Sequence, residues 1–114
     1  MIAISADEFA SIVDDELDAL PEDMLQGLDN VVFMIEDEPE DGSDLLGVYE
    51  GIALTERDYY AGVLPDRIVL FRGPLTRMCD TLEDLRDEVH ITLVHEIAHF
   101  YGIGEDELHE LGWG

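Results

Sequence analysis

The segment Thr92-Leu93-Val94-His95-Glu96-Ile97-Ala98-His99-Phe100-Tyr101-Gly102 contains the pattern His-Glu-x-x-His among apolar residues. Residues four apart in a helix lie on the same face, so His95 and His99 can offer two imidazole nitrogens to one ion. Zn²⁺ binds such nitrogens at about 2.0–2.1 Å. Glu96 is rotated by about 100° from His95. Its carboxylate therefore lies beside the ion, where it can take a proton from a metal-bound water without ligating the metal.

The alternative is that both histidines are ordinary core or surface residues and that Glu96 lies on a solvated side of the helix. The neighbouring residues argue against it, because Leu93, Val94 and Ile97 are all apolar. A helix this apolar rarely buries three ionisable groups without pairing them. The metal-binding interpretation is therefore preferred.

A zinc hydrolase needs a third protein ligand and an open fourth position for water. Because fifteen residues follow His99, we expect no ligand from a distant downstream helix. Gly102 is placed to end the helix in a left-handed conformation and turn the chain back. Glu105 then completes the spacing of the metzincin motif and is the expected third ligand. Asp106 and His109 remain alternatives, and a purely structural role as first-turn acids remains open for Glu105 and Asp106.

The length of 114 residues fits a single domain, 1–114, with one core. No segment approaches the roughly 18 apolar residues of a membrane span, and the N-terminal segment has neither the basic region nor the apolar run of a secretory signal. Cys79 is the only cysteine. An intramolecular disulfide is therefore impossible, and a reducing, cytoplasmic location is expected.

The formal net charge is −24, from twenty-nine acidic residues against five arginines and no lysine. A charge of this sign would repel nucleic acid and anionic membrane surfaces. Solubility, adaptation to high salt and a cation-attracting field are three explanations, of which the first two are preferred. The acidity favours cationic partners or metal ions but identifies none of them.

The chain before the motif predicts a helix followed by strands. Ser5-Ala6-Asp7-Glu8 is a capping box that opens an amphipathic helix over residues 6–20. A short turn follows Pro21. Apolar runs bounded by turn residues predict three strands, at residues 31–35, 46–54 and 67–71, and Gly73-Pro74 ends the third. The acidic loop 36–44 does not fit an EF-hand, because Pro39 would fall at a ligand position.

Thr81-Leu82-Glu83-Asp84 is a second capping box, opening a long helix that reaches Tyr101. Its apolar stripe is expected to pack on the sheet and consists of Leu82, Leu85, Val89 and Leu93. His90 is roughly 140° round the helix from His95 and is expected to be a spectator. A short last helix over 105–111 ends at Gly112. The order predicts an α+β fold over a small sheet.

Three segments and the closing residues resemble the small bacterial zincin-like metallopeptidase family. They are Leu45-Leu46-Gly47-Val48-Tyr49-x-Gly51, Leu64-Pro65-Asp66-x-Ile68-x-Leu70-Phe71-Arg72-x-Pro74-Leu75, His95-Glu-Ile-Ala-His99-Phe-Tyr-Gly102-Ile and Leu111-Gly112-Trp113. The resemblance covers nearly the full chain. It implies a compact α+β domain in which the zincin helix packs on a short mixed sheet, and a peptidase activity.

Carried over from this resemblance, His95 and His99 match the zinc ligands and Glu96 matches the catalytic acid/base. The third-ligand position of the family falls on Glu105, where Asp is the usual residue. No Met follows His99, so the Met-turn of the larger metzincin proteases cannot be placed.

The sequence thus predicts a zinc peptidase that binds one Zn²⁺ ion and acts on a peptide or protein, with neither nucleic acid nor membrane as a partner. Tyr49, Tyr101 and His109 are candidate oxyanion donors, although each is expected to be structural. An edge strand at 46–54 is a candidate for pairing with an extended peptide. The sequence does not determine the oligomeric state, and a monomer is compatible with it.

Two other functions are considered. The first is a non-catalytic zinc-binding regulatory or interaction module of the same fold. The second is an acidic mimic of nucleic acid, which leaves the histidine spacing unexplained. Two histidines and a carboxylate also suit Fe²⁺ or Mn²⁺, so the pattern favours zinc without excluding these ions.

Overall fold

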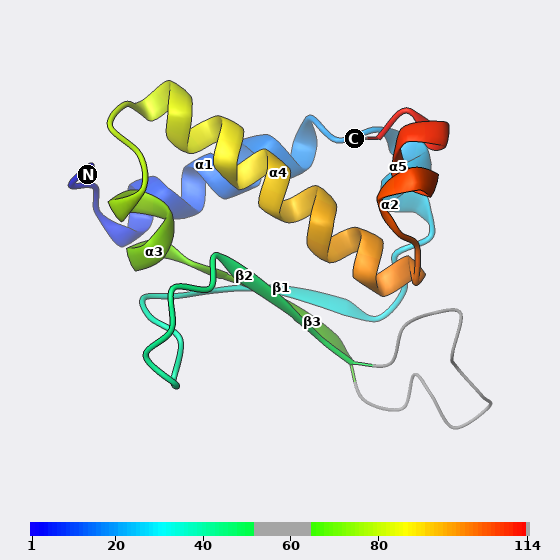
Figure 1. The fold of residues 1–114 in the computed structure, drawn as a ribbon, viewed down its shortest axis with the longest axis horizontal. Coiled ribbons are helices and arrows are strands. Elements are labelled where there is room, and N and C mark those ends of the chain that lie inside the picture. The colour runs from blue at the N-terminus through cyan, green and yellow to red at the C-terminus, as the bar shows by residue number, and fades with distance from the viewer. Residues whose placement is uncertain (52–64, 114) are drawn as a thin grey trace.

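The structure is a computed structural model, and it describes residues 1–51 and 65–113. Within these ranges helices pack on one side of a small sheet, as Figure 1 shows. This arrangement confirms the predicted α+β class. The elements in chain order are α1 (Ala6–Asp18), α2 (Glu22–Gln26), β1 (Val31–Glu36), β2 (Gly47–Glu50), β3 (Asp66–Phe71), α3 (Arg72–Arg77), α4 (Leu82–Tyr101) and α5 (Glu105–Leu111).

The sheet has the strand order β1-β3-β2. β1 runs parallel to β3, and β2 runs antiparallel to it, which confirms the mixed sheet that the family resemblance implied. β2 spans Gly47–Glu50 and is shorter at its start than the predicted strand 46–54. Residues 52–54 of that prediction lie outside the described residues.

The register of the strands separates the sheet into two faces. Phe33, Ile68 and Tyr49 lie side by side in one row, and Ile35 and Leu70 lie in the next row. Side chains two apart on a strand share a face, so these rows form a single apolar face. It packs against helices α1 and α4 and belongs to the hydrophobic core.

Helix α1 begins at the predicted capping box. Ser5 Oγ accepts a hydrogen bond from the Glu8 N–H at 3.1 Å, and the Glu8 side chain returns to the Ser5 backbone. The helix ends at Asp18 rather than at residue 20. Leu20 is nevertheless buried in the core, 5 % exposed, so the apolar stripe extends past the last helical turn.

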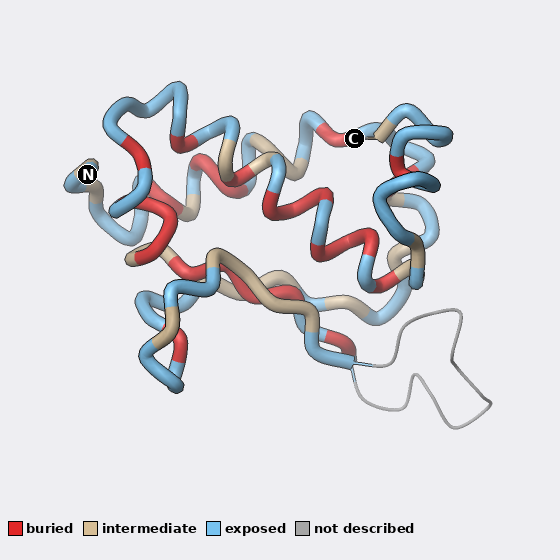
Figure 2. The backbone as a smooth tube through the Cα atoms, viewed as in Figure 1, coloured by how far each residue is buried: buried red, intermediate tan, exposed pale blue. Residues whose placement is uncertain are grey.

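Helix α4 starts where Thr81 Oγ1 accepts a hydrogen bond from the Asp84 N–H at 3.0 Å. Leu85, Val89 and Leu93 are fully buried, and Figure 2 shows the buried positions along the side of α4 that faces the other elements. The prediction for Leu82 is wrong, because its side chain is 53 % exposed. It occupies the first position of the helix, at the end that lies farthest from the sheet (Figure 1).

Helix α3 was not predicted. The third strand ends at Phe71 as expected, but Gly73-Pro74 lies inside a short helix, Arg72–Arg77, instead of in a loop. Proline is tolerated in the first turn of a helix, where its missing N–H would have no intrahelical partner. Within the described ranges, no helix is both long and apolar enough to cross a membrane.

Candidate functional site

The second half of helix α4 presents the His-Glu-x-x-His pattern as the sequence predicted. His95 and His99 are exposed, one helical turn apart on the solvent side of the helix. The side chain of His99 is 63 % exposed, whereas that of Glu96 is 12 % exposed. The two imidazoles are therefore accessible to a ligand from solvent, and the carboxylate between them lies deeper.

Strand β2 covers the side of α4 on which Glu96 lies. Thr92, Glu96 and Phe100 are spaced by four residues and share a face of the helix. At one end of this face, a Cβ at Gly47 would lie 2.7 Å from the Thr92 Cγ2 atom, so the close approach of β2 requires glycine. At the other end, the rings of Tyr49 and Phe100 are in edge contact, with centroids 6.2 Å apart. Glu96 therefore lies between the ends of the strand–helix contact.

Glu96 and His99 contact each other through their side chains. The Glu96 Oε1 atom lies 2.9 Å from the His99 Nδ1 atom. When Nδ1 carries the proton and donates to the carboxylate, Nε2 retains a lone pair. A neutral imidazole in this tautomer is the form that binds a metal ion, and a carboxylate partner on the other nitrogen orients the ring.

Gly102 ends helix α4 in the left-handed conformation that the sequence predicted, with φ 73° and ψ 32°. The Ile103 N–H donates to the Ala98 carbonyl at 3.1 Å, and the Gly102 N–H donates to the His99 carbonyl at 3.1 Å. These two bonds satisfy carbonyls in the last turn and reverse the chain direction. The reversal leads through Gly104, which precedes the first residue of α5, Glu105.

The reversal forms a pocket of about 260 Å³ between the end of α4 and the start of α5. His95, Glu96, His99 and Glu105 all line it. The structure thus brings the predicted acid/base residue and the three predicted metal ligands to one pocket. Asp106 and His109, the alternative third ligands, are exposed residues of α5 and are not among the residues that line it.

The described residues contain no group of three or more His, Cys, Asp or Glu side chains close enough to hold a metal ion. Glu105 is exposed at the first position of α5. In residues 1–51 and 65–113, no arginine forms an ion pair with it. Two imidazoles and a carboxylate without a competing cation are a donor set that suits Zn²⁺. The residues therefore fit zinc chemically, and the assignment of Glu105 as a ligand stays a prediction.

The candidate oxyanion donors Tyr49 and Tyr101 have other partners. The Tyr49 hydroxyl donates to Asp66 Oδ2 at 2.6 Å. The Tyr101 hydroxyl donates to the Met24 carbonyl, and burial raises the pKa of Tyr101, so its phenol stays protonated. Both phenols connect separate elements of the fold, which agrees with the structural role expected for them. His90 is not among the residues that line the pocket either, as expected for a spectator.

Two apolar residues of the pocket were not identified from the sequence. Ile103 lies in the turn and Leu108 lies in α5, where its side chain is buried in the hydrophobic core. Leu108 follows Glu105 by three positions, so the two residues share a face of the helix. The signal available in the sequence was a leucine directly after three acidic residues, which indicates that this side of the helix packs against the rest of the molecule.

Comparison with known proteins gives two findings. The sequence profile of a family described as zincin-like metallopeptidase matches residues 28–113. Among solved structures, a conserved hypothetical protein from Thermo thermophilus is similar, with a TM-score of 0.59 and 26 % sequence identity over 95 % of this chain and 97 % of that one. None of the curated proteins compared with the sequence is a match.

Proposed function

This chain belongs to the zincin-like metallopeptidase family, and we propose that it is a zinc-dependent peptidase. The family typically binds zinc. The observation that supports the proposal for this chain is the pocket lined by His95, His99, Glu105 and Glu96 at the reversal between α4 and α5. Two exposed imidazoles, one carboxylate beside them and a second carboxylate across the turn are the residue types that such hydrolysis needs.

In this proposal His95, His99 and Glu105 hold one zinc ion. The chemistry that zinc supplies when bound is that of a Lewis acid. His95 and His99 come from one rigid helix, so their spacing is set before any ion binds. Glu105 comes from the next helix, and its position depends on the turn at Gly102. The ligand set therefore combines two positions that are fixed locally with one that depends on the tertiary fold.

Glu96 is assigned to proton transfer. Its carboxylate takes a proton from the attacking water while the water oxygen bonds to the carbonyl carbon of the peptide. The bond from carbon to nitrogen then breaks, and Glu96 returns the proton to the leaving amine. Its side chain is 12 % exposed and lies on the wall of the pocket. This position removes it partly from bulk water while leaving it in reach of a bound substrate.

The proposed substrate is a peptide or an unfolded protein segment. The pocket of about 260 Å³ is small and is shared by polar and apolar residues. Ala98, Ile103 and Leu108 are the apolar side chains that line it. A site of this kind can contact one or two residues of a substrate, so we expect modest sequence selectivity.

The test is digestion of a peptide library by the zinc-loaded wild-type protein and by Glu96→Gln. Glutamine keeps the size of the side chain but is not a base at neutral pH. The variant should bind zinc as the wild type does and cleave at least about 100-fold more slowly. Glu110→Gln is the matched control, because Glu110 is an exposed acid of α5 that is not among the pocket residues. It should cleave at the wild-type rate.

A non-catalytic zinc-binding module of the same fold is the second candidate. It uses the same pocket residues to hold zinc but assigns no proton transfer to Glu96. The result expected for such a module is that the wild-type protein binds zinc and cleaves no peptide of the library. Cleavage by wild type that persists at the same rate in Glu96→Gln would instead contradict the role given to Glu96.

A further inference from the structure

The face of the sheet opposite α1 and α4 also has a distinct composition. Val48 and Val69 lie side by side on it, and Phe71 is the next residue of β3 on the same face. Val69 is 2 % exposed and Phe71 is 5 % exposed, yet neither belongs to the core cluster that the helices cover. Figure 1 shows the helices on the other side of the sheet. These side chains therefore form a second apolar cluster, separate from the core.

A groove of about 420 Å³ lies over this apolar cluster. Val48, Val69 and Phe71 line it, and the loop that joins β1 to β2 adds Pro39 and Leu45. Leu45 is 48 % exposed although it is a large apolar residue. The groove thus combines buried apolar residues with an exposed leucine that a partner can cover.

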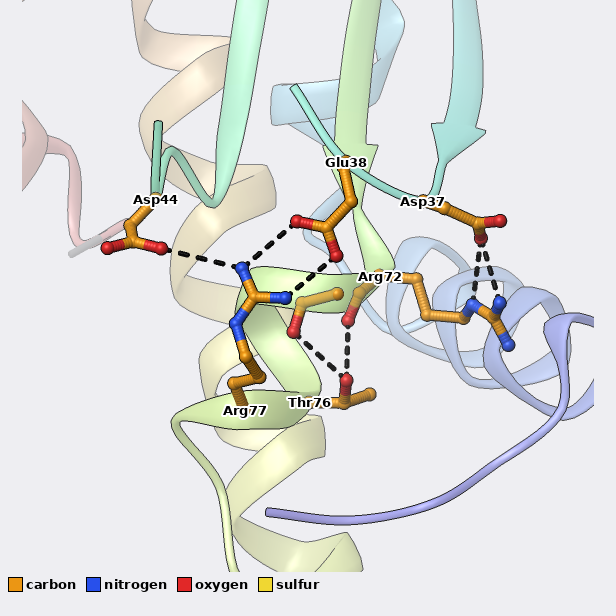
Figure 3. Close-up of polar contacts among 7 residues, drawn as sticks. Asp37, Glu38, Asp44, Arg72, Thr76 and Arg77 are labelled. Carbon is orange, nitrogen blue, oxygen red and sulfur yellow. Dashed lines mark hydrogen bonds and ion pairs between the residues drawn. The ribbon is translucent and has the colours of Figure 1, made fainter. Parts of the chain in front are cut away.

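Two arginines of α3 fix the loop that forms one side of the groove. Arg77 binds both carboxylate oxygens of Glu38, at 2.7 and 3.0 Å, and reaches Asp44 at 3.4 Å. Arg72 pairs with Asp37 at 2.9 Å. Figure 3 shows the Arg77 side chain between Glu38 and Asp44, and the Arg72 side chain extending to the other side to meet Asp37. The loop is tied down at both of its ends, so this side of the groove is formed before a partner binds.

The groove is acidic. Glu36, Glu40, Asp41 and Glu50 line it together with one arginine, Arg67. Arg67 is engaged by Glu50, with its Nε atom 3.0 Å from the carboxylate. Among the described residues, no arginine pairs with the other three acids. Asp41 is ionised at neutral pH, since Ser43, whose backbone N–H donates to Asp41 Oδ1 at 2.9 Å, lowers the pKa of Asp41. The uncompensated charge of the groove is negative.

We propose that this groove docks a basic peptide segment of a partner protein, with apolar side chains over Val48 and Leu45 and lysines or arginines against the acids. Charge complementarity selects this occupant. A second copy of the chain would bring another molecule of charge −24 to the same acids, and a nucleic acid would be repelled for the same reason. The groove lies across the sheet from α4, so docking leaves the histidine pocket accessible.

The probe is a short fluorescein-labelled peptide with valines at its centre and lysines on both sides, titrated with protein by fluorescence anisotropy. The triple variant Glu36→Gln, Glu40→Gln, Asp41→Asn should bind it about tenfold more weakly than wild type. The matched control neutralises three exposed acids of the helical layer, Asp14→Asn, Asp18→Asn and Glu110→Gln, and changes the net charge equally. The control should bind within about twofold of wild type.

Leu45→Ser is a second, independent variant, because an exposed residue can be replaced with little effect on folding. It should weaken binding about threefold by removing apolar contact. His95→Ala should not change the affinity, which separates this proposal from the proposed peptidase. The proposal is overturned by no binding to wild type, by equal weakening in both triple variants, or by a concentration-dependent dimer that excludes the peptide.

Discussion

The two sides of helix α4 differ in what they give the molecule. One side consists of leucine, valine and isoleucine residues that are fully buried, and it packs against the sheet and α1. The other side exposes His95 and His99 and lines a pocket. The two sides share the same backbone, so the packing of the first fixes the position of the second. The difference shows how a small domain uses one helix both to build its core and to position a candidate site.

The largest effect on folding is expected on the buried side. Leu93→Ala should lower the free energy of unfolding by about 3 kcal/mol, because Leu93 is fully buried and the substitution leaves a cavity. Ile91→Ala is the matched control on the exposed side of the same helix, where Ile91 is 44 % exposed. It should change the free energy by about 0.5 kcal/mol or less. Equal losses of unfolding free energy in Leu93→Ala and Ile91→Ala, measured by urea denaturation, would contradict the division of the helix into a buried and an exposed side.

The turn that joins α4 to α5 should be the next most sensitive position. Gly102→Ala should lower the free energy of unfolding by about 1–2 kcal/mol, because alanine is disfavoured at a φ of 73°. It should also weaken zinc binding if Glu105 is a ligand, since the turn positions Glu105. Gly104→Ala is the control, because Gly104 has a φ of −98° and open space around it. Gly104→Ala should lower the free energy of unfolding by about 0.5 kcal/mol. Thermal unfolding measures the change in both variants.

The smallest effect is expected from the exposed pair of Arg77 and Glu38. The hydrogen bond from Arg77 lowers the pKa of Glu38 from its ordinary value of 4.5. The stabilisation is therefore full above pH 4.5 and is lost as the pH falls through the lower pKa of the folded state. Arg77→Gln should melt slightly below wild type at pH 7, and the difference in Tm should vanish in strong acid. A difference that grows on acidification would be contrary to this linkage.

Local patterns explain which parts of the fold could be predicted from the sequence. The start of α4 at Thr81 and its end at Gly102 depend on residues within one turn, and both predictions are confirmed. Helix α3 was missed because Gly and Pro indicate a turn unless tertiary contacts, here the ion pairs of Arg72 and Arg77, stabilise a helix. Leu82 has the spacing of a core residue but lies beyond the sheet, which periodicity does not reveal.

The candidate site also has one part that local patterns predict and one part that depends on the tertiary fold. His95, Glu96 and His99 follow from the helical period alone, and the structure places all three on one pocket. Whether Glu105 reaches a shared ion depends on the angle between α4 and α5, which no local pattern specifies. The groove on the outer face of the sheet was not expected either, because it combines the loop 37–46 with residues of β1, β2 and β3 and therefore depends on the strand order.

Calorimetric titration of the protein with Zn²⁺, using material prepared without a nickel column, tests the proposed metal site at its ligands. We expect one tightly bound ion per chain, no tight binding by His95→Ala or His99→Ala, and at least tenfold weaker binding by Glu105→Gln. Asp106→Asn should bind as wild type does. Failure of the folded wild-type protein to bind zinc, or binding that is unchanged in both histidine variants, would contradict a zinc site at His95 and His99.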